Sequence, residues 1–241
     1  MQDLYKISIS MATYNGHKFI KQQLQSILPQ LNQHDEIIVV DDCSMDGTIE
    51  EILSISDDRI KIYRNLKNIG VVASFNHAIS MASGEIIFLS DQDDVWSDNK
   101  VDEIINLFRD FPKVTLVISD ALLIDENNFL ISESYFKLRG GFRSGCLSNI
   151  IKNKYLGCCM AIRREVLPQI LPIPNKVPMH DIWIGHINNI YGKIYFINKP
   201  LISYRRHKNN LTTLNHSPFK QMLKWRLQLI KYLFFRILKY S

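Results

Sequence analysis

Two short apolar runs constrain the fold of this 241-residue chain more than any other feature. Residues 36–41 read Glu-Ile-Ile-Val-Val-Asp and residues 85–90 read Glu-Ile-Ile-Phe-Leu-Ser, so a strand made from either run is apolar on both of its sides. Such strands are typical of the centre of a parallel sheet that helices cover on both faces. The two runs therefore predict an α/β fold.

Helical patterns alternate with strand patterns along the first half of the chain. The expected strands are Ile7–Ser10, Glu36–Asp41, Ile60–Tyr63, Glu85–Ser90 and Val114–Ser119. The expected helices between them are Phe19–Leu28, Thr48–Ile55, Val71–Met81 and Lys100–Phe111. This alternation predicts an α/β sandwich built of right-handed crossovers.

The pattern changes after about residue 120. We expect a strand at Cys158–Ile162, a helix at Asp181–Tyr191, paired strands around Ile194–Ile197 and Leu201–Tyr204, and an amphipathic helix at Ser217–Lys239. The aromatic and glycine-rich segment 135–143 has the composition of a mobile flap on the acceptor side of a site.

Composition is that of an average globular protein, with 46% apolar and 22% charged residues, which excludes a disordered chain or a coiled coil. No stretch approaches the roughly 20 uninterrupted apolar residues of a membrane span. The N-terminus does not resemble a secretory signal, and a cytosolic protein is the expectation. Four cysteines without paired spacing predict reduced thiols.

Positive charge is concentrated at one end of the chain. Residues 182–241 hold eleven of the 29 lysines and arginines and no acidic residue, so this end is expected to meet an anionic partner. The C-terminal helix has Leu and Phe side chains on one face and lysines on the other. That pattern suits a helix on anionic lipid, and the alternative is packing on its own domain or on a second subunit. Aromatic residues are not arranged for stacking on bases, so no nucleic-acid partner is expected.

Three polar clusters follow expected strands, at residues 12–16, 41–47 and 91–94. Ligands of open α/β sheets bind beyond the carboxyl ends of the strands. The crowded carboxylates of Asp91, Asp93 and Asp94 repel one another, and a divalent Mg²⁺ or Mn²⁺ with a diphosphate would relieve that repulsion. The alternative is a solvated acidic loop in which Asp98 and its neighbours cap the next helix.

Asp42 and Tyr14 fit a nucleobase. A carboxylate at the end of the second strand accepts the imide N–H of uracil or thymine, and an aromatic ring offers a face for stacking. The alternative is that Asp41, Asp42 and Ser44 form a turn before the helix at Thr48, and we expect one of the two aspartates to do so.

At this point the chain resembles a known family. Ile9–Gly16, Ile37–Thr48, Asn68–Gly70 and Gly84–Trp96 are similar in order and spacing to family 2 glycosyltransferases. The resemblance implies the GT-A fold, with a central, mostly parallel sheet flanked by helices and a Rossmann-like nucleotide-sugar half. The segments His180–Trp183, Gly192–Ile194 and 200–210 are similar to the rhamnosyltransferase-like branch that builds bacterial surface polysaccharides.

The resemblance implies an organisation and a function. Residues 1–216 would form one GT-A domain, with a nucleotide-binding half over about 1–120 and an acceptor half over about 121–216, followed by the basic helix 217–241. The enzyme would move rhamnose or a hexose, with inversion, from a UDP- or dTDP-linked donor to a glycan or lipid-linked acceptor for O-antigen or capsule. It would work in the cytoplasm, at the inner face of the plasma membrane.

The resemblance also implies roles for single residues. Ala12, Thr13, Tyr14 and Asp42 would line the nucleobase pocket, Asp91 would lie near the ribose, Asp93 would hold the metal with help from His207, and Asp181 would be the general base. Ala12 stands where the family usually has proline. The departing diphosphate needs a cation, for which Arg205, Arg206 and Lys208 are candidates.

Three other classes of function share part of this pattern. A catalytically inactive nucleotide-binding relative shares every motif except an effective base. A receiver-type Mg²⁺-binding signalling domain also has paired aspartates after a strand, but it needs the pair on the first strand and a chain of about half this length. A nucleotidyltransferase would need a phosphate-binding loop rich in glycine and arginine, which the N-terminal region lacks.

Overall fold

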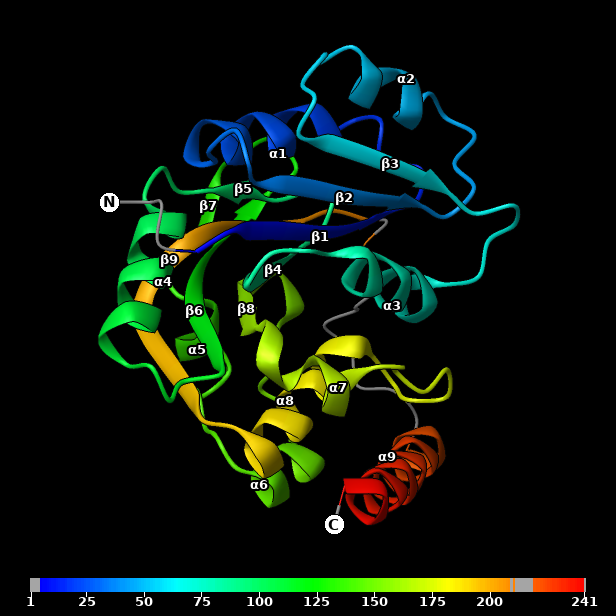
Figure 1. Cartoon of the computed structure of the whole chain (residues 1–241), viewed down its shortest axis with the longest axis vertical. Coiled ribbons are helices and arrows are strands. Elements are labelled where there is room, and N and C mark those ends of the chain that lie inside the picture. The colour runs from blue at the N-terminus through cyan, green and yellow to red at the C-terminus, as the bar shows by residue number, and fades with distance from the viewer. Residues whose placement is uncertain (1–4, 209, 211–218, 241) are drawn as a thin grey trace.

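The structure is a computed structural model that describes residues 5–208, 210 and 219–240. Over these residues the chain forms a curled, nine-stranded mixed sheet flanked by helices (Figure 1). The strands are β1 (Ile7–Thr13), β2 (Glu36–Asp41), β3 (Ile60–Arg64), β4 (Ile86–Ser90), β5 (Val95–Trp96), β6 (Leu116–Asp125), β7 (Leu130–Ser132), β8 (Met160–Arg163) and β9 (Ile194–Arg206). The α-helices are α1 (Ile20–Ile27), α2 (Thr48–Leu53), α3 (Val71–Met81), α4 (Lys100–Asp110), α5 (Tyr135–Leu138), α6 (Cys146–Ile151), α7 (Leu167–Ile170), α8 (His180–Tyr191) and α9 (Phe219–Tyr240). Short 3-10 turns are η2 (Leu28–Gln30), η3 (Gly157–Cys159) and η4 (Arg164–Val166).

The N-terminal half confirms the expected α/β arrangement. Strands β3, β2, β1 and β4 lie in that order and are all parallel. Every residue of β2 and β4 is buried, as their two-sided apolar sequences predict. Ile37 and Val39 of β2 face one apolar cluster, whereas Ile38 and Val40 pack with Ala78 of α3 on the other side. Helices α1 and α2 lie on the opposite side of these strands from α3 (Figure 1).

The C-terminal half extends the same sheet with mixed pairing. Strand β8 lies antiparallel between β4 and β6, and β6 is parallel to β9 along most of its length. The expectation of two paired strands at 194–197 and 201–204 is wrong, because one 13-residue strand covers both segments. Its register against β6 shifts between Ile197 and Pro200. A proline has no N–H to donate to a ladder, so the strand bulges at this point and does not turn back.

Several other boundaries differ from the expectation, and the largest difference is that the strand expected at Val114–Ser119 is β6, which runs from Leu116 to Asp125. The first two residues of the strand expected at Cys158–Ile162 belong to η3 (Gly157–Cys159), and the strand begins at Met160. The C-terminal helix is described from Phe219, so Ser217 and Pro218 of the expected helix lie outside the described residues.

Helix α9 packs against the body of the molecule along one side. Leu229 and Leu233 are buried in the main apolar core, and the guanidinium of Arg236 donates to the carbonyls of Gln169, Leu171 and Pro172. No helix within the described ranges is long and apolar enough to cross a membrane.

Candidate active site

The three polar clusters that follow β1, β2 and β4 lie side by side at one edge of the sheet. In the parallel register Thr13 pairs with Asp41, and Met11 pairs with Ser90, so the three strands end at nearly the same level. The residues that follow therefore face one another across short distances, as expected for a ligand-binding edge of an α/β sheet.

Gln92 ties the first cluster to the third. Its Oε1 accepts hydrogen bonds from the Thr13 hydroxyl at 2.5 Å and from the Tyr14 N–H at 2.8 Å, and its Nε2 donates to the Tyr14 carbonyl at 3.1 Å. A side chain at Gly16 would displace Gln92 from these hydrogen bonds. Gln92 lies in the predicted cluster 91–94 but was not among the expected site residues, although an uncharged amide inside an acidic cluster is a sign that it holds a neighbouring loop.

The residues expected to line the nucleobase pocket differ in how much of each side chain a ligand could contact. The Tyr14 side chain is 49% exposed and free to stack on a ring, whereas the Thr13 side chain is buried against Gln92. Ala12 is half-buried. Asp41 accepts the N–H of Ser44 at 3.0 Å, which makes Asp41 the aspartate of the predicted turn.

The Asp42 carboxylate is buried and already holds a neighbouring loop. It accepts hydrogen bonds from the Asn65 side chain at 2.9 Å and from the N–H groups of Ile69 and Gly70 at 2.8 Å each. A carboxylate oxygen can accept two hydrogen bonds. Oδ1 of Asp42 already accepts two and Oδ2 accepts one, so Oδ2 can accept one more donor.

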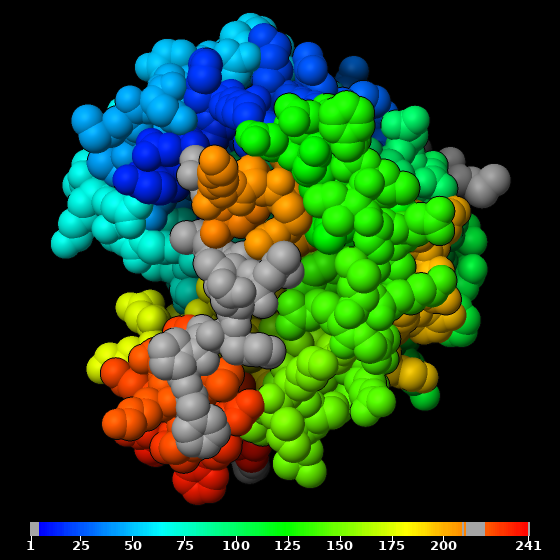
Figure 2. Space-filling model, turned by 180° about the vertical axis from the view of Figure 1, so that it is seen from behind, coloured from blue at the N-terminus to red at the C-terminus, as the bar shows by residue number. Residues whose placement is uncertain are grey.

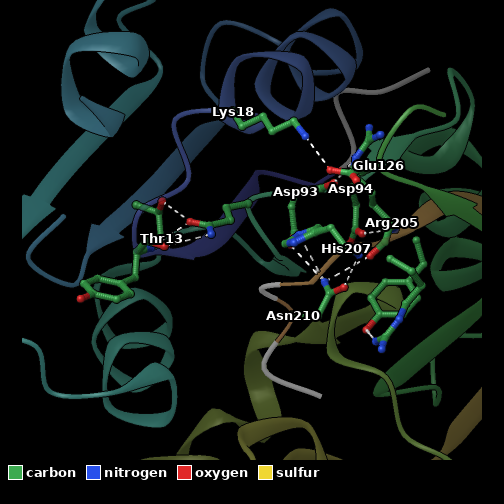
Figure 3. A network of polar contacts seen from close by, with 12 residues as sticks. Thr13, Lys18, Asp93, Asp94, Glu126, Arg205, His207 and Asn210 are labelled. Carbon is green, nitrogen blue, oxygen red and sulfur yellow. Dashed lines mark hydrogen bonds and ion pairs between the residues drawn. The ribbon is translucent and has the colours of Figure 1, made fainter. Parts of the chain in front are cut away.

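Asp93 and His207 lie in contact, although 114 positions separate them in the sequence (Figure 3). The His207 Nε2 is 2.7 Å from Asp93 Oδ2, and the Asn210 side-chain amide is 3.4 Å from the same oxygen. The residue pair expected to share a metal is therefore brought together by the ends of β4 and β9. Asn210 was not among the expected residues.

Arg205 does not have the position that the sequence analysis gave it. Its side chain is only 1% exposed, and it donates to the Asp93 carbonyl at 2.7 Å, to Asn128 Oδ1 at 2.7 Å and to Gln22 Oε1 at 2.9 Å (Figure 3). Its guanidinium carbon lies 4.8 Å from the centroid of the Phe19 ring. The guanidinium of Arg205 is therefore used in contacts within the protein.

Asp91 and Asp94 form a second acidic group behind Asp93. Ligand atoms of Asp91, Asp94 and Cys158 lie within 4.8 Å of one another. Burial, and then the negative charges of Asp93 and Asp181, raise the pKa of Asp91 to about 7. Burial and the charges of Asp93 and Asp91 likewise raise the pKa of Asp94.

This chemistry fits a divalent cation at the edge of the sheet. Asp94 Oδ2 is buried and has no hydrogen-bond partner among the described residues, and carboxylate oxygens in excess of positive charge are what Mg²⁺ and Mn²⁺ prefer. Asp91, Asp94 and Cys158 are one candidate set of ligands, and Asp93 with His207 is a second one.

Asp181 is buried in the first turn of α8, and its charge acts on Asp91. Burial raises the pKa of Asp181 to about 6, although backbone N–H groups of Ile182 and Gly157 oppose the shift. A side chain at Gly157 would collide with His180, so the close approach of this backbone requires glycine. The arrangement gives a carboxylate that is ionised at neutral pH yet basic enough to accept a proton.

The expected flap lies close to Asp181. Asp120, which the sequence analysis missed, accepts hydrogen bonds from the Ser134 hydroxyl and the Phe136 N–H and so fixes the start of α5. The Arg139 side chain donates to the Tyr135 hydroxyl at 3.0 Å, and its positive charge lowers the pKa of Asp181 slightly against the effect of burial. Gly140 and Gly141, which follow, both have φ near +81°, a region that favours glycine.

Comparisons with known proteins place this geometry in context. The family model described as Glycosyl transferase family 2 matches residues 8–171. One relative, the Escherichia coli UDP-Glc:alpha-D-GlcNAc-diphosphoundecaprenol beta-1,3-glucosyltransferase WfgD, is 31% identical over 222 residues, which cover 91% of this chain and 83% of that protein. The chain spans between 66% and 83% of the length of the first three curated relatives that it matches.

Two solved structures have the same fold. Staphylococcus aureus TarS 1–349 in complex with UDP-GlcNAc has a TM-score of 0.72 at 19% identity, over 93% of this chain and 66% of that one. The mannosyltransferase PcManGT from Pyrobaculum calidifontis, in complex with GDP-Man and Mn²⁺, has a TM-score of 0.60 at 20% identity, over 81% of this chain and 55% of that one.

The burial of Asp181 predicts that it destabilises the folded protein when ionised. Its pKa is about 6 in the folded chain and 3.8 ordinarily, so the penalty is full above pH 6 and disappears as the pH falls through 6 toward 4. Asp181→Asn should therefore raise the free energy of unfolding at pH 7.5 by about 1–3 kcal/mol, and the difference should vanish near pH 4.

Urea unfolding at a series of pH values measures this difference. Asp98→Asn, at an exposed carboxylate before α4, is the control and should show no pH-dependent gain. A lower stability of Asp181→Asn at pH 7.5 would contradict the expectation.

Proposed function

The chain belongs to glycosyl transferase family 2, and from this premise we propose that it moves a hexose, with inversion, from a UDP-linked donor to a lipid-linked glycan. The observation that carries the proposal is the pairing of an acidic, cation-binding edge, Asp91 to Asp94 with His207, with the buried base Asp181 beside it. A UDP-hexose is supported by the names of WfgD and TarS, whose donors carry UDP. Transfer of rhamnose from a dTDP-linked donor is the second candidate, through the resemblance of residues 180–210.

The donor would lie along the three strand ends. Tyr14 stacks on the base, and Asp42 accepts the imide N–H with the capacity left by Asn65 and Gly70. Asp91 lies next to the ribose. Asp93 and His207 would hold a divalent cation, which when bound neutralises charge on the diphosphate. Since Arg205 is buried in the scaffold, Arg206 and Lys208 are the proposed cations for the leaving group.

Asp181 performs the proton transfer. The acceptor hydroxyl gives its proton to the Asp181 carboxylate while its oxygen forms a bond to the anomeric carbon. The bond from that carbon to the diphosphate oxygen breaks, and its electron pair leaves with the nucleoside diphosphate. A base positioned in this way contributes about 10²–10⁴-fold to the rate.

Helix α9 would hold the enzyme at the cytoplasmic surface of a membrane, where a lipid-linked acceptor lies. Five large apolar side chains at helical spacing form an outward stripe and are between 45% and 60% exposed: Leu223, Leu227, Ile230, Phe234 and Leu238. Lys220, Lys224 and Lys231 are exposed beside this stripe. Figure 2 shows the orange-to-red helix at the lower edge of the molecule, with a side turned outward.

Both the apolar stripe of α9 and the lysines beside it are suited to contact with anionic lipid. The buried side of α9 uses other residues, Leu229, Leu233 and Arg236, so the sequence-based apolar face splits into a protein-facing side and an outward side. An apolar stripe bordered by lysines, in a segment without any acidic residue, is complementary to an anionic bilayer.

A nucleotide panel tests donor and metal binding. UDP with Mn²⁺ should raise the unfolding temperature, since a ligand at a hundred times its Kd adds about 2.7 kcal/mol of stability. dTDP should give a smaller shift of the unfolding temperature than UDP, and GDP the smallest. Asp93→Asn should lose the part of the shift that depends on Mn²⁺, whereas the control Asp98→Asn should keep it. If no nucleotide changes the midpoint, or if Asp93→Asn responds like the wild type, donor binding at this edge is wrong.

Sugar transfer tests the base. With UDP-hexoses and a synthetic GlcNAc-diphosphate-alkyl acceptor, Asp181→Asn should lower kcat about 10²–10⁴-fold without loss of stability. The wild-type kcat/KM should fall about tenfold per pH unit below 6, because a protonated Asp181 accepts no proton. An Asp181→Asn enzyme that transfers at the wild-type rate would refute the assignment. Nucleotide binding without transfer from any donor would identify an inactive relative.

Liposome flotation tests the membrane surface. Leu227→Glu with Phe234→Glu should lower binding to vesicles of phosphatidylglycerol and phosphatidylcholine at least tenfold, and binding should weaken with salt. Leu53→Glu with Leu66→Glu, at exposed leucines far from α9, is the matched control and should bind normally. If the α9 variant instead converts a dimer to a monomer, with no vesicle binding by either form, the face belongs to a second copy of the chain.

A further inference from the structure

Basic side chains gather in the segment that holds α5 and α6. Residues 135–155 contain five lysines and arginines and no acidic residue. Four of these, Arg139, Arg143, Lys152 and Lys154, are called the basic loop cluster below. Within the described part of the chain, no carboxylate oxygen lies within 4.0 Å of their side-chain nitrogens. The cluster therefore carries positive charge that the protein does not itself pair.

Lys154 is the buried member of the cluster. It is 6% exposed, and among the described residues its ammonium donates only to the carbonyl of Arg139. A neutral carbonyl does not balance a full charge, and lysines are almost never buried in this way unless they are paired. Burial, and then the positive charges of Lys152, Arg139 and Arg143, lower the pKa of Lys154. A bound anion is the partner that this arrangement lacks.

The buried side chain of Asn149 brings the backbone of Arg143 next to that of Lys154. Its Nδ2 donates to the carbonyls of Arg143 and Gly145 at 2.9 Å each, and its Oδ1 accepts the N–H of Lys154 at 2.9 Å. The bond from the Lys154 ammonium to Arg139 adds a third segment to this group. Hydrogen bonds of the fold therefore gather cationic residues that are well separated in the sequence.

One side of the basic loop cluster meets the helix that carries the proposed base. The N–H of Gly145 donates to Asn189 Oδ1 of α8 at 3.0 Å. Gly157, which follows Lys154 closely in the chain, gives its backbone N–H to the Asp181 carboxylate. A ligand bound at the cluster would therefore lie next to the place where the acceptor hydroxyl must give up its proton.

The other side of the cluster meets α9. Arg226, next to Leu227 of the outward apolar stripe, donates from Nη2 to the carbonyl of Ile151 at 2.6 Å. Leu147 and Ile151, one turn apart on α6, are 79% and 70% exposed. Figure 2 shows light green atoms of this part of the chain against the orange-to-red helix. Exposed apolar side chains of α6 and α9 thus border the cations on the side away from Asp181.

We propose that the basic loop cluster binds the diphosphate that joins the lipid and the glycan of the acceptor. Linked phosphates carry concentrated negative charge, and lysine and arginine bind them with charge-assisted hydrogen bonds. A diphosphate at the cluster has its glycan toward Asp181 and its lipid toward the apolar side chains of α6 and α9. The inference rests on the proposed function, because that function supplies a lipid-linked acceptor.

Binding of a soluble acceptor analogue tests the site. In titration calorimetry with a short-chain GlcNAc-diphosphate-alkyl compound, Arg143→Gln and Lys154→Gln should each raise the Kd about tenfold, because each removes a charged donor. Arg143→Lys keeps the charge and should bind within about threefold of the wild type. Lys113→Gln, at an exposed lysine in the turn before β6, is the control and should bind normally.

A wild-type Kd in both Arg143→Gln and Lys154→Gln would overturn the proposal. If Lys154→Gln does not fold, Arg143→Gln decides, because Arg143 is exposed and its side chain holds no part of the fold among the described residues. Inorganic diphosphate should compete with the analogue, and the absence of competition would also count against the site.

Transfer kinetics separate this site from a structural role and from other anions. Arg143→Gln should raise the KM for the diphosphate acceptor about tenfold, with an unchanged KM for the UDP-hexose and unchanged kcat/KM for a neutral GlcNAc-alkyl acceptor. An equal loss with both acceptors would indicate a structural role. A higher KM for the UDP-hexose alone would assign the cluster to the donor, and weaker vesicle binding alone would assign it to bulk anionic lipid. Each of these results overturns the proposal.

The two levels of proposal fail in different ways. A wild type that binds the diphosphate analogue through the cluster, yet transfers no sugar, refutes the proposed function and leaves the anion site. A wild type that transfers sugar equally well to neutral and diphosphate acceptors refutes the anion site and leaves the proposed function.

Discussion

Repulsion among carboxylates is the constraint on which the rest of the site depends. Asp91, Asp93 and Asp94 follow one strand, and Asp181 adds its charge from a helix that begins about 90 residues later. Charges of one sign held together in a poorly solvated edge are tolerated only when cations, hydrogen-bond donors or protons compensate them. Around these carboxylates, His207 Nε2 lies 2.7 Å from Asp93, the Arg205 N–H donates to Asp94, and the pKa values of Asp91, Asp94 and Asp181 are raised.

Several polar side chains near the edge make hydrogen bonds within the protein. Gln92, Asp42 and Arg205 could each contact a substrate by chemistry alone, yet each makes hydrogen bonds that fix a neighbouring loop. Residues that remain open, such as Tyr14, are held in place by these buried neighbours. The positions of the loops at this edge therefore depend on side chains that a sequence motif alone would predict to bind the ligand.

Much of the fold could be predicted from the sequence, because a strand that is buried on both faces has a continuous run of apolar residues. Strand β2 and helix α3 have the predicted bounds, since an apolar run and a helical repeat each specify local structure. The single strand β9 could not be predicted in this way, because Pro200 is a usual sign of a turn and only pairing with β6 carries the strand past it.

The sequence predicts which segments meet at the site, but it predicts few of the contacts between their side chains. The clusters after β1, β2 and β4 meet because parallel strands end at one edge, and a spacing argument anticipates this. Arg205 is buried through contacts with Asn128 and Gln22, which are remote in sequence. The basic sequence around Arg205 therefore gives no sign that its side chain is buried.

The continuity of the sheet has a consequence for how substrates reach the site. Hydrogen-bonded pairing runs without interruption from β3 through β8 and β6 to β9, so the N-terminal and C-terminal parts of the described chain share one continuous sheet. A jaw-like rotation of one half against the other would have to break that ladder. Entry and exit are thus left to short segments at the rim, where paired glycines such as Gly140 and Gly141 let the backbone swing without disturbing the strands beneath.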